Sequence, residues 1–442
     1  MSFEVITRLH HDTGGQFGAG DFTDKPCPAI TNGTGGNSQH YQVFYYTTDT
    51  PPRIVKPENK PPYRVPLMSE IAALPWNGFK VASTFSGCGG SCTGYRMAGF
   101  RVVWANEFVP AAQASYKANA AADCILDTRD IRTVQPEDIL AATGLKAGEL
   151  DLFDGSPPCA SFSTAGKREA GWGKVKAYSD TKQRTDDLFA EYVRILNGLQ
   201  PKVFVAENVS GLVKGTAKGM FLQILAALKG CGYRVTCRVL DAQWLGVPQQ
   251  RQRTIFVGVR EDLNREPVHP SPLPYRYSVR DALPWITSIT GRVGTGYHRS
   301  PVSPVSPVSP APAITATGDA QTRFEVEAET DISRYAIGAE WDKVKVGGAS
   351  SKYFSLVKPC PTKPCPTVQA SHGEASIAGI VHPIEKRKFT IAELRRICAF
   401  PDDFILCGTY AQQWERLGRS VPPVMMAAIA SAIRDGILSK CR

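Results

Sequence analysis

The sequence lacks three features that would each have placed it in a familiar class of protein. None of its 12 cysteines forms a C-x-x-C pair, so a structural zinc site has no support and we expect no metal. No apolar run approaches the roughly 18 residues that cross a bilayer, and the N-terminus has no basic-then-apolar signal peptide. We therefore expect a soluble cytoplasmic protein with reduced cysteines and no membrane contact.

Size and charge set further bounds on the kind of protein. The chain has 442 residues, enough for one large domain and a smaller one, and 43% of them are hydrophobic, so it can bury a core. Its 51 basic against 41 acidic residues give a net charge of +10. This excess is a weak indication of a polyanionic partner, because many ordinary enzymes are basic too.

Short apolar runs alternate with helical stretches from residue 80 onward. The runs predicted as buried strands are 80–85, 102–106, 150–154, 203–206 and 254–259. The helices predicted between them are 93–99, 110–121, 185–199 and 219–230. This alternation predicts a parallel, doubly wound α/β sheet, in which reactive groups collect beyond the carboxyl ends of the strands.

Composition divides the chain into four segments, which span residues 1–75, 76–261, 262–386 and 387–442. The first is rich in Gly, Pro and Thr and is predicted to be an irregular or partly extended N-terminal extension, and the second holds the α/β pattern. The third has many prolines, with a Ser-Pro-Val repeat over 300–310 that predicts a linker or exposed loop. The last returns to regular structure and ends in a predicted helix over 423–438, whose Pro-Pro start suits a first turn.

A glycine-rich turn follows the first predicted strand. Residues 85–90 read Phe-Ser-Gly-Cys-Gly-Gly between a strand and a helix, and Glu107 lies at the end of the next apolar run. Glycines let a backbone approach a ligand, and an acidic residue at such a strand end can hold a ribose diol. A plain strand–helix turn explains the pattern nearly as well. The glycines fit G-x-G-x-x-G poorly, which counts against a dehydrogenase.

Three further motifs lie at the ends of predicted strands. Cys159 follows a Pro-Pro pair and could be a positioned nucleophile, although alone a buried loop cysteine is the simpler interpretation. Glu207 could be an ion-paired or helix-capping residue, or a carboxylic acid that donates a proton to a ring nitrogen. Arg251 and Arg253 lie at i and i+2 and point the same way, so they could clamp a phosphate or a base carbonyl, or be solvated edge charges.

In this order, the motifs resemble those of the DNA cytosine-5 methyltransferases. The resemblance covers roughly residues 80–260 and 387–438. It implies a Rossmann-like S-adenosylmethionine-dependent methyltransferase sheet over 76–261, a smaller target-recognition domain over 262–386, and a segment 387–442 that returns to the catalytic domain. The matching positions are 85–90, Asn106-Glu107, Asp130-Ile131, Pro158-Cys159, 207–209, 250–253, 387–389, Phe400-Pro401 and 418–421.

The resemblance also implies roles for single residues. Arg419 departs from the pattern, because the family usually has Asn there; it could pair with the cofactor's carboxylate or mark reduced activity. The groups implied to act on the base are Cys159 as nucleophile, Glu207 as the acid at cytosine N3, Arg251 and Arg253 as contacts to the flipped nucleotide, and Thr367 as a contact to the target strand. The residues implied to bind S-adenosylmethionine are Phe85, Gly87, Cys88, Gly90, Glu107, Asp130, Ile131, Pro158, Leu188 and Ser420.

The chemistry itself requires such a set of groups. Carbon 5 of cytosine is a poor nucleophile, but a thiolate that adds at carbon 6 with N3 protonated turns the ring into an enamine able to attack a sulfonium methyl. The base must leave the duplex to reach these groups. Lysines, arginines and glycines over 166–184 predict a mobile basic loop that closes over DNA phosphates, with a solvated charge run as the alternative.

Three alternatives stay open on the sequence alone. Exocyclic-amine methyltransferases carry S-P-P-Y/W, close to the Ser-Pro-Pro before Cys159, but they need an aromatic residue where this cysteine stands. Methylation of tRNA by the same chemistry would need less than the long segment 262–386. A DNA-binding relative with weakened catalysis is disfavoured by Cys159 and Glu207, and weakly favoured by Arg419.

The partners follow from the same interpretation. We expect double-stranded DNA as the substrate and a monomeric enzyme in the cytoplasm, associated with the nucleoid in a bacterial host. If the chain belongs to a restriction-modification system, a cognate restriction endonuclease would be a further partner.

Overall fold

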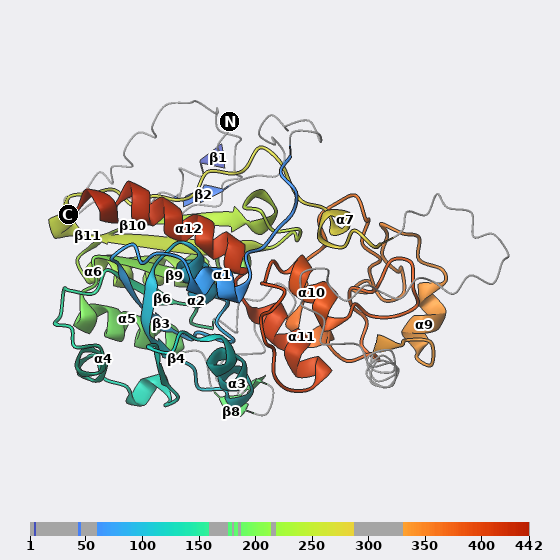
Figure 1. Cartoon of the computed structure of the whole chain (residues 1–442), viewed down its shortest axis with the longest axis horizontal. Coiled ribbons are helices and arrows are strands. Elements are labelled where there is room, and N and C mark those ends of the chain that lie inside the picture. The colour runs from blue at the N-terminus through green and yellow to red at the C-terminus, as the bar shows by residue number, and fades with distance from the viewer. Residues whose placement is uncertain are drawn as a thin grey trace, which may run out of the picture.

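A large lobe built around one sheet carries a smaller second lobe at its side in this computed structural model (Figure 1). The Cys159 position, much of the basic loop and the Ser-Pro-Val repeat lie outside the described residues. The structure describes residues 4–5, 43–45, 60–158, 176–178, 181–183, 187–213, 218–286 and 330–441.

The sheet of the large lobe contains nine described strands. The strands predicted from the sequence are confirmed as β3, β4, β6, β9 and β11. Within the N-terminal extension, the two short strands β1 and β2 extend one edge of the sheet. The extension also contains the short helix α1 (Met68–Ala72), which the sequence did not predict. Across the sheet the order is β1 (Glu4–Val5), β2 (Val43–Tyr45), β10 (Tyr233–Asp241), β11 (Gln252–Arg260), β9 (Val203–Val209), β6 (Leu152–Gly155), β3 (Lys80–Thr84), β4 (Arg101–Asn106) and β5 (Ile125–Asp127).

The predicted parallel sheet is confirmed for five strands, whereas the predicted strand β11 runs the other way. This strand pairs antiparallel with both β10 and β9, whereas β9, β6, β3, β4 and β5 are parallel to one another. Between β10 and β11 the chain forms only the 3-10 turn Ala242–Trp244 and no crossover helix, so it turns back on itself. Strands β10 and β5 were not predicted, although the alternating pattern of Tyr233–Asp241 is a strand signal.

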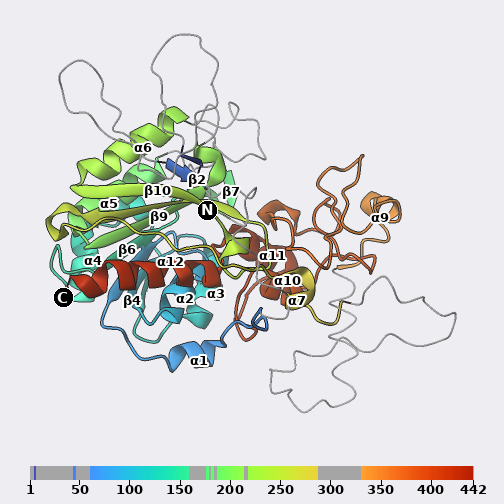
Figure 2. The ribbon, with the colours of Figure 1, turned by 90° about the horizontal axis from the view of Figure 1, so that it is seen from above.

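One face of the sheet is covered by α2 (Gly90–Met97) and α12 (Pro423–Gly436), which lie against each other (Figure 2). They share one core with the inward side chains of β3, β4, β6, β9 and β11, to which α3 (Pro110–Asn119) adds Tyr116. α12 begins at Pro423 as predicted, because the fixed φ of proline suits the first turn of a helix. The C-terminal helix therefore packs beside the helix that follows the glycine-rich turn.

The opposite face is covered by α4 (Pro136–Thr143), α5 (Leu188–Leu199) and α6 (Lys218–Gly230). Leu188, Tyr192, Ile195 and Leu199 recur at helical spacing, so α5 presents one apolar stripe to the sheet. The helices predicted from the sequence are confirmed, with α5 starting at Leu188. Just before it, β7 (Lys176–Tyr178) and β8 (Thr181–Gln183) pair as a separate antiparallel ribbon.

The second lobe is built on a core of its own. α7 (Val279–Ala282), α10 (Ile391–Ile397) and α11 (Tyr410–Arg419) bury their apolar side chains there together with Val368. α9 (Ala336–Trp341) belongs to a small neighbouring core. The division of the chain into a target-recognition domain and a returning segment stays a prediction.

Among the residues that the structure describes, one stretch, Tyr410–Lys440, is long and apolar enough to cross a membrane by length and composition alone. It consists of α11, α12 and the 3-10 turn Leu438–Lys440, and more than half of its apolar window is buried. Packing in the two protein cores accounts for its apolar character.

Candidate active site

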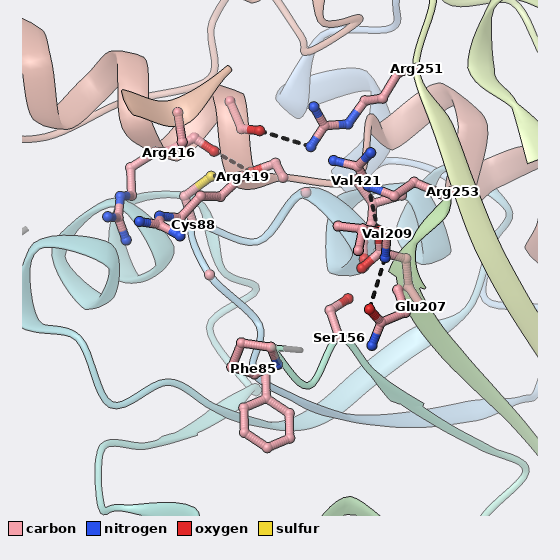
Figure 3. Close-up of a pocket in the computed structure, with 18 of the residues that line it drawn as sticks. Phe85, Cys88, Ser156, Glu207, Val209, Arg251, Arg253, Arg416, Arg419 and Val421 are labelled. Atoms are coloured by element: carbon pink, nitrogen blue, oxygen red, sulfur yellow. Dashed lines mark hydrogen bonds and ion pairs between the residues drawn. The ribbon is translucent and has the colours of Figure 1, made fainter. Parts of the chain in front are cut away.

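A cavity of about 950 Å³ opens at the carboxyl ends of the parallel strands and reaches the second lobe (Figure 3). Most of the predicted site residues meet there, as the geometry of doubly wound sheets leads one to expect. Their individual roles stay predictions. Those that line the cavity are Phe85, Gly87, Cys88, Gly90, Glu107, Asp130, Ile131, Pro158, Leu188, Glu207, Arg251, Arg253, Thr367, Arg419 and Ser420.

The chain approaches the predicted nucleophile along the cavity wall. Pro157 and Pro158 line the cavity, and the side-chain amide Nδ2 of Asn208 donates to the carbonyl oxygen of Pro157 at 3.2 Å. This bond ties the Pro-Pro segment to the end of β9. Cys159, the next residue in the sequence, lies outside the described residues.

The glycine turn after β3 is tightly built. Phe85 and Gly87 have φ values of 54° and 57°, in the left-handed region that residues other than glycine rarely adopt. A side chain at Gly90 has no room, because its Cβ would lie 2.5 Å from the carbonyl oxygen of Val421. No side chain caps the N-terminus of α2, which leaves the first helical amides for a ligand.

Glu107 holds this turn in place by hydrogen bonds to the main chain. Its buried carboxylate accepts hydrogen bonds from the amides of Gly87, at 2.8 Å, and Val109, at 2.7 Å. Burial raises the pKa of Glu107, and these hydrogen bonds oppose the shift. Because a carboxylate has about four lone-pair sites, Glu107 retains capacity for the ribose hydroxyls that the resemblance assigns to it.

Asp130, Ile131 and Leu188 form the next part of the wall. Asp130 accepts from the amide of Arg132 at 3.0 Å and forms an ion pair with its guanidinium at 3.0 Å. Ile131 and Leu188 are almost completely buried. An apolar slot with a carboxylate at its side suits a purine ring that carries an exocyclic amine.

Glu207 and Arg253 form an ion pair at the inner end of the cavity. They lie on the adjacent strands β9 and β11, whose register places Ile255 opposite Glu207. Arg253 Nε lies 2.6 Å from Glu207 Oε1, and the two side chains are only 13% and 10% exposed. Burial lowers the pKa of Arg253 and Glu207 counteracts this shift. Of the interpretations of Glu207, the ion-paired one is observed, and its role as an acid stays a prediction.

Arg251 connects the two lobes. Its fully buried guanidinium donates to the carbonyl oxygen of Gly418 at 2.8 Å and to that of Val368 at 3.4 Å. Burial lowers the pKa of Arg251, with a smaller contribution from Arg253. Arg251 borders the cavity while holding second-lobe main chain in place, and its contact to a flipped nucleotide stays a prediction.

Thr367 reaches the cavity because two segments run side by side at the junction of the lobes. The amide of Gln250 donates to the carbonyl oxygen of Cys365 at 2.7 Å, and the amide of Cys365 donates to that of Pro248 at 2.9 Å. The hydroxyl of Thr367 then donates to the carbonyl oxygen of Gln250 at 2.5 Å. Thr367 thereby faces the same space as Arg251.

The end of α11 closes the cavity near the glycine turn. Cys88 Sγ lies 3.1 Å from Ser420 Oγ, which donates to the carbonyl oxygen of Arg416. Arg416 and Arg419 both pair with Glu415, at 2.9 and 2.7 Å. Arg419, which stands where the family usually has Asn, is 41% exposed and borders the cavity (Figure 3). The two guanidiniums suit a carboxylate ligand.

Several lining residues were not predicted from the sequence. Arg416 could have been, because it lies at i−3 from Arg419 on the same helical face. Asn208 lies inside the 207–209 motif and Ser156 inside the Ser-Pro-Pro stretch, but neither was assigned a role. No motif marked the others, because sheet order and lobe packing bring them to the cavity. The described lining also includes Ser156, Asn208, Asp241, Gln243, Arg276 and Gln369.

The mixed sheet, the glycine turn with its partner Glu107, and the buried Glu207 on β9 together define an α/β methyltransferase. The C-5 cytosine-specific DNA methylase family matches residues 79–435, so the chain belongs to this family. It is a DNA cytosine-5 methyltransferase that uses S-adenosylmethionine. This assignment decides against the exocyclic-amine and tRNA alternatives.

Type II methyltransferases of several bacteria are similar in sequence to this chain over most of their own length. Type II methyltransferase M.DdeI of Desulfomicrobium norvegicum is 30% identical over 80% of this chain and 88% of its own. M.AgeI of Thalassovita gelatinovora is 33% identical over 81% of this chain and 100% of its own. M.NgoPII of Neisseria gonorrhoeae is 29% identical over 83% and 98%.

Solved structures share the fold. A DNA modification methyltransferase encoded within an E. coli prophage superposes with a TM-score of 0.59 at 20% identity, covering 81% of this chain and 99% of its own. A DNMT2 mutant from Spodoptera frugiperda gives a TM-score of 0.52 at 18% identity, with coverages of 79% and 98%. These likenesses support the methyltransferase fold.

Proposed function

We propose that the chain is a type II modification methyltransferase that flips a cytosine out of double-stranded DNA and methylates it through a covalent bond to Cys159. The observation that carries the proposal is the buried Glu207–Arg253 pair at the inner end of a cavity whose opposite wall has the glycine turn and Glu107. The chain enters Cys159 directly from the cavity-lining Pro158.

The residues present fit S-adenosylmethionine. Gly90 sits where a Cβ would collide, Glu107 has acceptor capacity beside the turn, and Ile131 and Leu188 offer an apolar slot. When bound, this group supplies an electrophilic methyl. Gly87–Gly90 would hold its methionine part, Glu107 its ribose, and the slot its adenine.

The chain's own groups would then activate the base. The thiolate of Cys159 adds to carbon 6 of cytosine while Glu207 gives a proton to N3, so the electron pair of the ring's 5,6 double bond becomes available at carbon 5. Carbon 5 takes the methyl group, a base removes its proton, and the sulfur leaves carbon 6. Arg253 would hold the Glu207 carboxyl group toward the ring throughout, and Arg251 would shape the entrance.

We place substrate selection in the second lobe. Residues 262–386 would read the DNA sequence, the basic loop after Cys159 would close on phosphates, and Thr367 would contact the target strand. The enzyme would work as a monomer in the cytoplasm on nucleoid DNA. The type II methyltransferases among its relatives support a cognate restriction endonuclease as a partner.

DNA that contains 5-fluorocytosine tests the proposal, because fluorine cannot leave carbon 5 as a cation and the covalent complex should persist. With cofactor present, we expect a species that survives denaturing electrophoresis, loss of it in Cys159→Ser, and strong slowing in Glu207→Gln. Cys360→Ser is the matched control, since that thiol is partly exposed and its pKa is lowered by the hydroxyl of Thr362. Trapping that survives Cys159→Ser would refute the assignment. Bisulfite sequencing of host DNA after expression then gives the methylated position and its sequence context.

A further inference from the structure

Arg276 lines the cavity, but the proposed mechanism gives it no task. It is partly exposed and lies in the segment between β11 and α7, where the chain passes to the second lobe. The other described arginines of the cavity wall each have a protein acceptor: main-chain carbonyl oxygens for Arg251, Glu207 for Arg253, and Glu415 for Arg416 and Arg419. Arg276 forms no ion pair within the described part of the chain, so its charge is available to an anionic ligand.

Neutral groups hold the guanidinium of Arg276 in place. Its Cζ lies 4.6 Å from the centroid of the Trp244 ring, and its Nη1 donates to Oε1 of Gln243 at 3.1 Å. The main chain is fixed nearby, because the amide of Leu273 donates to the carbonyl oxygen of Trp244 at 2.7 Å. A stacked guanidinium of this kind has already lost conformational freedom and keeps further N–H donors for a ligand.

The orientation of Gln243 is set from behind by Asp241, at the carboxyl end of β10. Asp241 accepts from Nε2 of Gln243 at 2.8 Å and from its main-chain amide at 3.3 Å. Both side chains are almost completely buried. Because Asp241 receives the amide nitrogen, the amide oxygen of Gln243 is turned toward Arg276. Asp241 therefore positions the guanidinium through Gln243 without pairing with it.

The sheet order separates Arg276 from the predicted cofactor site. β10 is parallel to β9, since both are antiparallel to β11, so Asp241 lies at the same edge of the sheet as the cavity. Four strand spacings, about 19 Å, separate β10 from β3, where the glycine turn begins. Two spacings, about 10 Å, separate β10 from Glu207 on β9. On this side of Glu207, the anion that the proposed function brings is the DNA backbone.

We propose that Arg276 binds a phosphate of the target DNA strand beside the flipped cytosine, with its guanidinium held by Trp244 and Gln243. Arginine suits this ligand, because its planar fork can donate two parallel N–H bonds to a phosphate. Such a contact carries no sequence information, so Arg276 positions the nucleotide in front of Glu207 and does not select the site. The inference rests on the proposed function, because a flipped base brings its backbone to the mouth of the cavity.

The competing explanation is purely structural. Packing of Arg276 on Trp244 could serve only to stabilise the segment that leads to the second lobe. The two explanations differ in their dependence on salt. A cation that neutralises a phosphate releases counterions and contributes about 0.9 to the slope of log K against log salt concentration, whereas a packing contact contributes nothing to this slope.

The first measurement is the affinity for a duplex that carries the methylated site, by fluorescence anisotropy from about 50 to 200 mM salt with S-adenosylhomocysteine saturating. For Arg276→Met we expect a slope smaller by about 0.9 and an affinity about eightfold lower at about 0.1 M salt. Arg276→Gln, which is neutral but keeps an N–H donor for Gln243, should behave alike. Arg276→Lys retains the charge and should keep the wild-type slope.

Arg101→Met is the matched control. The guanidinium of Arg101 also lies 4.6 Å from the ring centroid of a tryptophan, Trp76. It pairs with Asp123 at 3.3 Å, however, and begins β4 at the amino edge of the sheet, away from the cavity. The slope for Arg101→Met should therefore equal that of the wild type.

The second measurement locates the phosphate. Uncharged methylphosphonates replace the phosphates around the target cytosine one at a time. The wild type should lose affinity at the phosphate that Arg276 binds, whereas Arg276→Met should be insensitive at that position and respond as the wild type does elsewhere. Affinity for S-adenosylhomocysteine, which is predicted to bind at the glycine turn, should be unchanged and so shows that the variant is folded.

Three outcomes separate the ideas. A reduced slope in both neutral variants, retained in Arg276→Lys and Arg101→Met, with one methylphosphonate position silenced, supports the proposal. A wild-type slope and a wild-type methylphosphonate profile in Arg276→Met and Arg276→Gln overturn it in favour of the structural explanation. If the wild type forms no covalent complex with 5-fluorocytosine DNA, the proposed function itself fails, and with it the basis of this inference.

Discussion

The Glu207–Arg253 pair makes a quantitative prediction about stability. Its atoms are 2.6 Å apart and both side chains are nearly buried, so Arg253→Met leaves a desolvated carboxylate without its cation. Breaking a buried pair from one side destabilises a protein by about 3–5 kcal/mol, and we expect about 3 kcal/mol because the cavity admits water. Glu207→Gln should cost less, about 1–2 kcal/mol, since Arg253 also donates to the carbonyl oxygen of Gln252 at 2.8 Å.

A double-mutant cycle measures the interaction energy between Glu207 and Arg253 directly. Urea unfolding followed by tryptophan fluorescence gives the unfolding free energy of each variant, and the double variant should be about 2 kcal/mol more stable than the sum of the single losses implies. Arg234→Met is the surface control, because its pair with Glu266 is 38% and 77% exposed and should contribute less than about 1 kcal/mol. Additive losses, or a loss in Arg253→Met no larger than the control's, would refute the reasoning.

Three further predictions concern ligands. Calorimetry with S-adenosylhomocysteine should show Glu107→Ala weakening binding at least about tenfold, through loss of the ribose bonds and of support for the turn, and unchanged affinity would remove the ribose assignment. Arg419→Asn should weaken S-adenosylhomocysteine about tenfold but not methylthioadenosine, which lacks the aminocarboxylate; an equal effect on both would mean that Arg419 does not meet that group. Exchange of residues 262–386 with those of a relative of known specificity should transfer the methylated sequence, read by bisulfite sequencing, and a folded, active chimera with its original target would contradict the domain assignment.

The sequence alone was enough to predict a site residue where its motif lies at the end of a single predicted strand. The turn at residues 85–90, Glu107 and Glu207 are each recognisable locally, because strand ends and glycines have local signatures. The antiparallel β11 was not anticipated, because strand direction depends on how the chain returns after β10. The antiparallel direction of β11 brings Arg253 next to Glu207. The sequence motifs did not predict that these two residues pair.

Local sequence patterns could not predict the contacts between segments that are distant in the chain. Arg251 has the right spacing for a cavity residue, yet its partners Gly418 and Val368 both come from the second lobe. Such long-range pairing depends on the topology of the fold. The topology is determined by the whole sequence together and not by any local motif.

The packing of α12 on α2 has a consequence for how the enzyme is made. Gly90 and Gly94 approach the main chain of Val421 and Pro423 so closely that an added Cβ would lie 2.5 Å from each carbonyl oxygen. The glycine turn is among the first parts of the described sheet lobe to leave the ribosome. Val421, which lines the cavity beside the turn, and α12, which packs on α2, are among the last. A nascent chain therefore carries its glycine turn without the packing of α12, and we expect modification of DNA to begin only after translation has passed Gly436, the last residue of α12.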